Sequence, residues 1–304
     1  MSPAARPVLR RLSLAAIVVN VGIVVTGGIV RITGSGLGCP DWPTCDGRRV
    51  VPAAAEADWH TAIEFGNRLM TFLVLAVVVW LFFEARRRAT DRQVRLLALL
   101  LPVGVLAQAV LGGITVLTGL HPLTVAAHFL LSMVLIAVAV VLYVRVSRPR
   151  GDAPRSDPRL RRLVTGTLVV AAVVLVLGTL VTASGPHAGD PGTVRLGLDI
   201  RVIARLHSTA VWGVVALTAL SYFQAQASDH DQVKRAALWL LVVEVAQGAV
   251  GYTQYALGIP APLVAVHVFL AALFWVAAVR MGALALGSPA VGADAPTSST
   301  RVGV

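Results

Sequence analysis

The chain has 304 residues, of which 57% are hydrophobic and only 13% are charged, and its mean hydropathy is +0.79. About a quarter of the residues of an ordinary soluble domain are charged, so this composition excludes a water-soluble globular protein and predicts a membrane protein. The formal net charge of +11 does not indicate nucleic-acid binding, because the sequence offers no soluble basic domain to carry it.

Eight apolar blocks follow one another along the chain, each long enough to cross a bilayer. A hydrocarbon layer of ~30 Å needs about 20 helical residues. Helices are favoured over barrel strands, because each block is about twice as long as a strand of ~10 residues. We therefore expect an all-α polytopic membrane protein with helices near residues 12–30, 61–83, 96–117, 123–144, 163–183, 202–223, 237–257 and 262–282.

Basic residues mark alternate ends of these blocks. Arg10 and Arg11 precede the first block, residues 86–88 after the second are all arginine, and seven arginines between 145 and 162 follow the fourth. By the positive-inside rule these ends face the cytoplasm, so both termini are expected inside. We expect a multi-pass protein of the cell (plasma) membrane, whose first block is an anchor and not a cleaved signal peptide.

An internal repeat divides the chain. The segment Ala107–Gly112 (AQAVLG) resembles Ala246–Gly251 (AQGAVG) at an offset of 139 residues (107 to 246), and the same offset sets His128 on His267. Four spans per repeat let both halves enter the membrane from the same side. We expect two parallel-related four-helix bundles, with an N-terminal half at 1–147, a cytoplasmic linker at 148–161, a C-terminal half at 162–284 and a disordered tail at 285–304.

Three histidines are expected inside the membrane at one depth. His128, His207 and His267 each lie one to two turns from the outer end of their span. A polar side chain in lipid is costly unless it faces the bundle, and imidazole is a strong axial ligand of haem iron. We expect His207 and His267 to bind opposite faces of one haem. Histidines hydrogen-bonded across helices without a metal are the alternative, and zinc is disfavoured because its sites need clustered ligands.

The first half departs from the second at one decisive position. Asn67 stands where the second half has His207, at an offset of 140 residues (67 to 207), so the first half offers His128 alone. His60 is seven residues from Asn67, about 10 Å along a helix axis, and cannot simply replace the missing ligand. We expect His128 to hold a haem whose other face is open or weakly held. An open position suits oxidation chemistry, whereas a closed pair suits electron transfer.

Glu64 shares one helical face with His60 and Asn67, which stand at i, i+4 and i+7 in the order His60, Glu64, Asn67. A buried carboxylate close to a haem edge is suited to acid–base work, so Glu64 is a candidate catalytic residue. The alternative is a glutamate at the outer interface that is neutralised by Arg68 or Arg31.

Six segments of the sequence resemble the haem A synthase family. They are TGGIVRITGSGLGCPDWPTCDG (26–47), IEFGNR (63–68), TGLHPLTVAAHFL (118–130), TASGPHAGD (182–190), RLHS (205–208) and APLVAVHVF (261–269). The likeness runs over nearly the whole chain, from about residue 12 to 282. The GSGLxCPDWPxC stretch and the set of histidines are highly specific together.

The resemblance implies a membrane oxidoreductase that oxidises the C8 methyl of haem O to a formyl group and so makes haem A for terminal oxidase assembly. It implies that the N-terminal half binds haem O as substrate and the C-terminal half binds haem B as cofactor. By the same resemblance Glu64 is the catalytic carboxylate, His128 a ligand of haem O, and His207 and His267 the ligands of haem B. Many members have His where this chain has Asn67, so it resembles a subset of the family.

Cys39 and Cys45 are the only cysteines, and they flank Pro-Asp-Trp-Pro-Thr in the first outer loop. A disulfide can persist at such an oxidising location, and we expect one between them. It is either a structural staple of the loop or, as the resemblance implies, a redox-active pair. The corresponding loop of the other half, 184–200, has no cysteine.

Several other polar residues have smaller expected roles. Arg68, Arg201 and Arg205 lie at the outer ends of spans, where they either bind haem propionates or extend to the interface. Trp42 and Trp59 are expected as interface anchors. Hydrogen bonding between helices is expected for Gln108, Glu244 and Gln247.

Two rival functions stay open. An electron-transfer cytochrome b would want a His pair in each half, and a haem-handling transporter would have no need of Glu64. The expected partners are haem O, membrane lipid and, by the resemblance, haem O synthase and assembly factors of cytochrome c oxidase. Homo-oligomerisation stays open, and no nucleic-acid partner is expected.

Overall fold

Eight long helices and no strands make up the part of the chain that the computed structural model describes, residues 5–52, 58–148 and 157–287. All eight are long and apolar enough to cross a membrane, which confirms the predicted fold class of an all-α polytopic membrane protein. They are α1 (Ala5–Ile32), α2 (Trp59–Arg88), α3 (Arg92–Leu117), α4 (Pro122–Ser147), α5 (Pro158–Ser184), α6 (Ile200–Ala227), α7 (Asp231–Ala256) and α8 (Ala261–Leu286).

The helices extend a few residues beyond the apolar blocks at their ends. A helix of 26 residues, such as α3, is about 39 Å long and exceeds the ~30 Å hydrocarbon layer, so its ends reach the headgroup region. Aspartates cap several first turns there. Asp58 accepts a hydrogen bond from the amide of Thr61 at 2.8 Å, and this amide lowers the pKa of Asp58. The helix starts are therefore set by capping groups and not by hydropathy.

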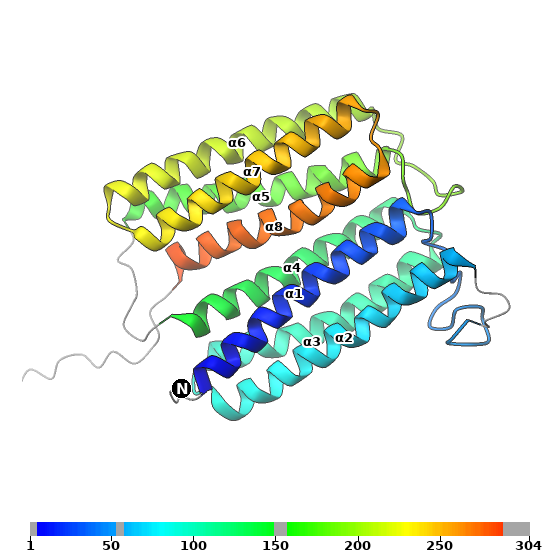
Figure 1. The fold of residues 1–304 in the computed structure, drawn as a ribbon, viewed down its shortest axis with the longest axis horizontal. Coiled ribbons are helices and arrows are strands. Elements are labelled where there is room, and N and C mark those ends of the chain that lie inside the picture. The colour runs from blue at the N-terminus through cyan, green and yellow to red at the C-terminus, as the bar shows by residue number, and fades with distance from the viewer. Residues whose placement is uncertain (1–4, 53–57, 149–156, 288–304) are drawn as a thin grey trace, which may run out of the picture.

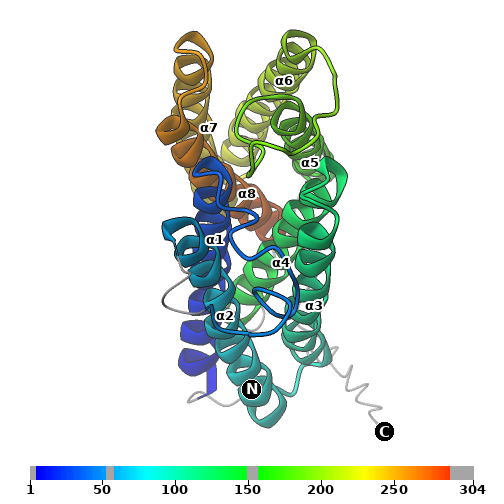
Figure 2. The same cartoon turned by 90° about the vertical axis from the view of Figure 1, so that its right-hand side faces the viewer.

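The helices form two rings of four that lie side by side (Figure 1). Within each ring every helix contacts the next and the last contacts the first, α1 to α4 in one ring and α5 to α8 in the other. The rings meet through α1, α4, α5 and α8, and α4 and α8 lie between the two groups in the end view (Figure 2). Trp275 of α8 crosses this junction, since its Nε1 donates to the carbonyl oxygen of Met133 on α4 at 2.7 Å.

Large apolar side chains on the outside of the rings face where lipid would lie. On α2, Val74, Val78 and Leu81 are buried against the other helices, whereas Phe72 and Trp80 are exposed. Because lipid tails are as apolar as the protein interior, an outward face needs no charged residues and packing between helices decides which side turns inward. This arrangement keeps the polar intramembrane groups inside the rings.

The internal repeat appears in the backbone of two turns. Between α3 and α4, Gly119 and Leu120 have φ of 61° and 58°, and between α7 and α8, Gly258 and Ile259 have φ of 77° and 63°. These pairs are related by the offset of 139 residues that the sequence predicts (120 to 259). The predicted linker at 148–161 and tail at 285–304 lie mostly outside the described residues, and the boundaries of the two halves stay a prediction.

Candidate functional site

Two histidines of the second ring face each other. The rings of His207 on α6 and His267 on α8 have centroids 6.5 Å apart and planes inclined by 63°. Nδ1 of His207 donates to the carbonyl oxygen of Val174 at 3.1 Å, which orients the imidazole and leaves its Nε2 available as a ligand. The sequence predicted this pairing, and the geometry brings the two residues together.

The separation of the imidazole rings of His207 and His267 fits a single metal ion between them. An imidazole nitrogen binds a first-row metal at about 2.0–2.1 Å, so two rings on opposite sides of one ion have centroids about 6 Å apart once ~1 Å from each nitrogen to its ring centre is added. Among the described residues, no group of three or more His, Cys, Asp or Glu could hold a metal ion. The pair therefore suits a metal that brings its other ligands in a macrocycle, as haem does, better than it suits zinc.

A glycine on the preceding helix faces each of the three intramembrane histidines. A Cβ at Gly178 would lie 3.3 Å from Cε1 of His207, one at Gly251 would lie 3.2 Å from Cε1 of His267, and one at Gly112 would lie 3.1 Å from Cε1 of His128. Even a Cβ would require each imidazole to shift by a few tenths of an ångström, and a larger side chain would require a larger shift. These glycine seats were not predicted from the sequence, although Gly112 and Gly251 are aligned within the repeat.

Two glutamines hold the histidine-bearing helices at matching positions. Nε2 of Gln108 donates to the carbonyl oxygen of His128 at 3.0 Å, and Nε2 of Gln247 donates to that of His267 at 3.1 Å. Their predicted role in hydrogen bonding between helices is confirmed, as it is for Glu244, which accepts from Thr218 at 2.8 Å. The two halves thus support His128 and His267 in the same way.

The first ring of helices has one imidazole fewer than the second, but it keeps the glycine against which that imidazole would pack. Residues 27–30 (GGIV) of α1 match residues 178–181 (GTLV) of α5, so Gly27 corresponds to Gly178. A Cβ at Gly27 would meet no atom within 4 Å. Asn67 is shorter than the imidazole of His207, and its Oδ1 accepts a hydrogen bond from Thr26 at 2.6 Å. The site of His128 therefore differs from that of His267 by one missing ring.

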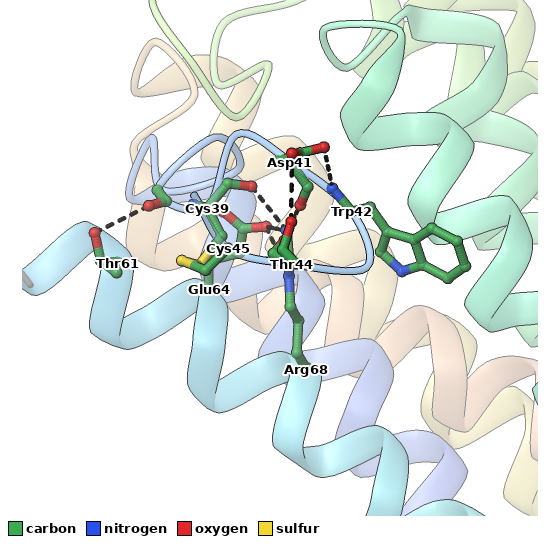
Figure 3. A network of polar contacts seen from close by, with 9 residues as sticks. Cys39, Asp41, Trp42, Thr44, Cys45, Thr61, Glu64 and Arg68 are labelled. Atoms are coloured by element: carbon green, nitrogen blue, oxygen red, sulfur yellow. Dashed lines mark hydrogen bonds and ion pairs between the residues drawn. A yellow bond between two sulfur atoms is a disulfide. The ribbon is translucent and has the colours of Figure 1, made fainter. Parts of the chain in front are cut away.

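The loop between α1 and α2 folds over the end of the first ring at which α1 ends and α2 begins, and we call residues 36–47 the lid. Its cysteines, Cys39 and Cys45, form the predicted disulfide with Cα atoms 4.4 Å apart. The indole of Trp42 points toward α3 (Figure 3), where a Cβ at Gly113 would lie 2.5 Å from Cδ2 of the indole. Gly113 is next to the glycine that faces His128. The lid thus covers the His128 site at this end of the helix ring, and the interface-anchor role of Trp42 stays a prediction.

Glu64 and Arg68 clamp the lid from below (Figure 3). Oε2 of the buried Glu64 accepts from the amide of Cys39 at 2.6 Å, and its Oε1 accepts from Nη2 of Arg68 at 2.8 Å. Arg68 also donates to the carbonyl oxygens of Cys39, Asp41 and Thr44, at 2.7, 3.0 and 2.9 Å. Pairing of Glu64 with Arg68 was the alternative reading of the sequence, and the contacts to the lid were not predicted.

His60, in the first turn of α2, lies beside the start of the lid. Its Nδ1 bonds to Oγ of Ser35 at 3.0 Å, and its ring centroid is 3.6 Å from that of the exposed Trp59. A Cβ at Gly38 would come within 2.7 Å of the His60 carbonyl oxygen, so glycine is required for the lid to pass this close to the helix. After the lid, the backbone amides of Arg49 and Arg48 lower the pKa of Asp46, and they fix the turn that follows Cys45.

Arg201 and Arg205 are exposed at the outer end of α6. Neither forms an ion pair with any residue that the structure describes. Their geometry fits extension to the interface as well as it fits a propionate contact, so both roles stay predictions.

More than half of the chain matches the model of a known protein family. The model, described as COX15-CtaA, cytochrome oxidase assembly protein, matches residues 10–189. This range contains the first ring, the lid and α5, and it ends in the outer loop that follows α5.

Similar proteins from three bacteria carry the name "Heme A synthase". The chain is 28% identical over 266 residues to the protein of Symbiobacterium thermophilum, an alignment that covers 80% of this chain and 84% of the relative. It is 31% identical over 156 residues to that of Bacillus pumilus and 34% identical over 136 residues to that of Lysinibacillus sphaericus. These two alignments cover 50% and 44% of this chain and 48% and 43% of the relatives, so the chain spans about half the length of these two.

Proposed function

The chain belongs to the COX15-CtaA family of cytochrome oxidase assembly proteins, and we propose that it is a haem A synthase that oxidises the C8 methyl of haem O to a formyl group. The observation that carries this proposal is the asymmetry of the two rings. Each ring of helices has an imidazole packed against a glycine at the same place in the repeat, His128 in the first and His267 in the second. Only the second ring has another imidazole, that of His207, facing it. One closed site and one open site suit a cofactor and a substrate in the same molecule.

In the second ring, His207 and His267 would hold haem B. Held by these two imidazoles, the haem would supply electron transfer. The ring separation of 6.5 Å and the bond from His207 to Val174 support this assignment. Gly178 and Gly251, which face these two imidazoles, restrict where the imidazoles can lie.

In the first ring, His128 would hold the iron of haem O as substrate. Asn67 occupies the place of the second imidazole, and its amide is engaged with Thr26. The face of the substrate opposite His128 would therefore have no imidazole at the position of Asn67. An open iron position suits oxidation chemistry, whereas a closed pair of ligands suits electron transfer.

Glu64 is proposed as the group that exchanges protons with the reacting methyl. It is one helical turn from Asn67, about 4.5 Å along α2, and lies below the lid. When the oxygen atom comes from water, oxidation of a methyl to a formyl group releases four protons and passes four electrons to an external acceptor. A carboxylate held by the amide of Cys39 and by Arg68 can accept these protons at a fixed position. The lid would keep bulk water from the outer end of the site.

The decisive experiment is extraction of haems from membranes that make haem O, with and without this chain. We expect haem A only where the chain is present, and its absence there would reject the enzyme. Glu64→Gln should retain bound haem and lower haem A formation by about 10²–10⁴-fold, the usual contribution of a positioned acid or base. Glu84→Gln, at a buried glutamate of the same helix that pairs with Arg88, is the control and should leave haem A formation unchanged.

Electron transfer without haem oxidation is the second candidate function, and the His207–His267 pair is the observation that favours it. Such a protein would show the same b-type spectrum but would leave haem O unchanged in the extraction experiment. We further propose that the protein lies in the cell membrane with both termini in the cytoplasm, and that it receives haem O from haem O synthase within the bilayer.

A further inference from the structure

Two arginines from different halves of the chain meet at the outer end of the molecule. Arg31 belongs to the last turn of α1, and Arg195 to the loop between α5 and α6. This loop packs against the end of α1, since a Cβ at Gly189 would lie 3.9 Å from Cα of Arg31, and the charge of Arg195 opposes that of Arg31. Nη2 of Arg31 crosses to the second ring and donates to the carbonyl oxygen of Thr182 at 2.7 Å.

These two positive charges have no acidic partner within the described part of the chain, because the five ion pairs found there involve neither Arg31 nor Arg195. Nη1 of Arg195 is buried and has no hydrogen-bond partner. A buried cationic donor without a partner costs free energy, and here a second cation adds repulsion. Such a pair is expected to be balanced by an anion with more than one oxygen.

The pair lies next to the site of His207 and His267. Thr182 is four residues beyond Gly178 on α5, which places its carbonyl about 6 Å further toward the outer end than the glycine that seats His207. A haem carries its two carboxylates on one edge of the macrocycle, and guanidinium groups bind carboxylates through two parallel hydrogen bonds. An edge that points outward from the imidazole pair would bring its carboxylates to these arginines.

We propose that Arg31 and Arg195 together bind the propionate carboxylates of the haem held by His207 and His267. This inference rests on the proposed haem site, but not on the oxidation of haem O. It makes the haem of the second ring dependent on a residue of the first. Arg201 and Arg205, which the sequence suggested for this role, are exposed.

A phospholipid phosphate is a less suitable anion for this place. Loops from both halves interlock over Arg31, since the amide of Gly36 donates to the carbonyl oxygen of Gly189 at 2.8 Å and a Cβ at Gly189 would lie 3.9 Å from Cα of Arg31. The exposed arginines of α6 are better placed for headgroups.

The test compares haem B with its dimethyl ester, which has the same iron and ring but no carboxylates. The apoprotein, purified in detergent from haem-depleted cells, is titrated with each compound while the low-spin absorbance is followed. We expect the natural chain to bind haem B more tightly than the ester by on the order of tenfold or more. Arg31→Met and Arg195→Met should lose most of this preference and bind the ester as the natural chain does.

Arg48→Met is the matched control, because it removes an exposed positive charge from the same side of the molecule. It should keep the full preference, and Arg31→Lys should keep part of it. An unchanged preference in both Met variants would overturn the inference, even if they bound phosphatidylglycerol less well. An equal loss for haem B and the ester would also overturn it, because the arginines would then only support the fold. A chain that makes no haem A can still pass this test.

Discussion

Single residues decide what each half of this protein can hold. The glycines at 112, 178 and 251 let three imidazoles pack against a neighbouring helix backbone, where even a Cβ would require the imidazole to shift by a few tenths of an ångström. In a helix, glycine costs about 1 kcal/mol relative to alanine, so three such residues are expensive unless each has a packing role. Here the role is to fix the place of a ligand.

Replacing Gly251 by valine should remove the haem of the second ring. Its Cβ would lie 3.2 Å from Cε1 of His267, and the added methyl groups would rotate the imidazole away from His207. We expect the low-spin haem absorbance per protein to fall to the background of His267→Ala. Gly248→Val is the control, because a Cβ at Gly248 on the same helix meets no atom within 4 Å. Full haem content in Gly251→Val would show that the seat does not constrain the ligand.

Asn67→His should convert the open site of the first ring into a closed one. The space beside Gly27 can receive an imidazole, since the equivalent space at Gly178 already does. We expect a second low-spin signal in the electron paramagnetic resonance spectrum of the haem-loaded protein. Asn67→Gln adds length without a strong ligand and should give no such signal. A spectrum that Asn67→His leaves unchanged would contradict the assignment of this face.

At the scale of elements, the lid is the part that local sequence rules describe least well. Its disulfide could be predicted because two cysteines stand six residues apart in an outer loop. Its seating could not, because Arg68 reaches carbonyl groups more than twenty residues away in the chain, and Trp42 finds a gap on α3 that only the folded ring creates. The ion pair of Glu64 with Arg68 can be predicted from their i to i+4 spacing, but the contacts of these two residues with the lid cannot.

Loss of the disulfide should leave the lid in place. In the chain-entropy account, closing a loop of this length contributes about 2 kcal/mol to stability, so Cys39→Ser with Cys45→Ser should lower the thermal midpoint. The clamp by Glu64 and Arg68 remains, so trypsin should cut after Arg48 or Arg49 little faster than in the natural chain. Arg68→Met should expose these bonds much more. If haem A formation stopped while the lid stayed protected, the cysteines would have a redox role.

The number of spans and the division into two repeats can be predicted from the sequence more fully than the helix ends and the docking of the two rings of helices. Eight apolar blocks fix the number of spans, because blocks of this length fit helices and are too long for barrel strands. The repeat of Ala107–Gly112 in Ala246–Gly251 places Gly112 and Gly251 in equivalent contacts with histidines. The helix ends differ from the apolar blocks because aspartates such as Asp58 cap them in the headgroup region. The contact of Arg31 with Thr182 depends on how the rings dock, which no local pattern specifies.

The orientation in the membrane can be tested with single thiols. The chain's only cysteines are joined in the disulfide, so an introduced cysteine is the only free one. We expect a membrane-impermeant maleimide to label Leu198→Cys in intact cells, and to label Ala227→Cys only after the membrane is opened. Both positions are exposed, and they stand at opposite ends of α6. The reverse pattern would place the lid in the cytoplasm.

The junction of α4 with α8 gives this chain the build of a fused dimer. In a symmetric dimer of identical subunits, every substitution appears twice, so an exchange of histidine for asparagine would alter both sites at once. Joining the two copies in one polypeptide removes that constraint. One copy can then hold a permanently bound cofactor while the other binds a substrate and releases a product.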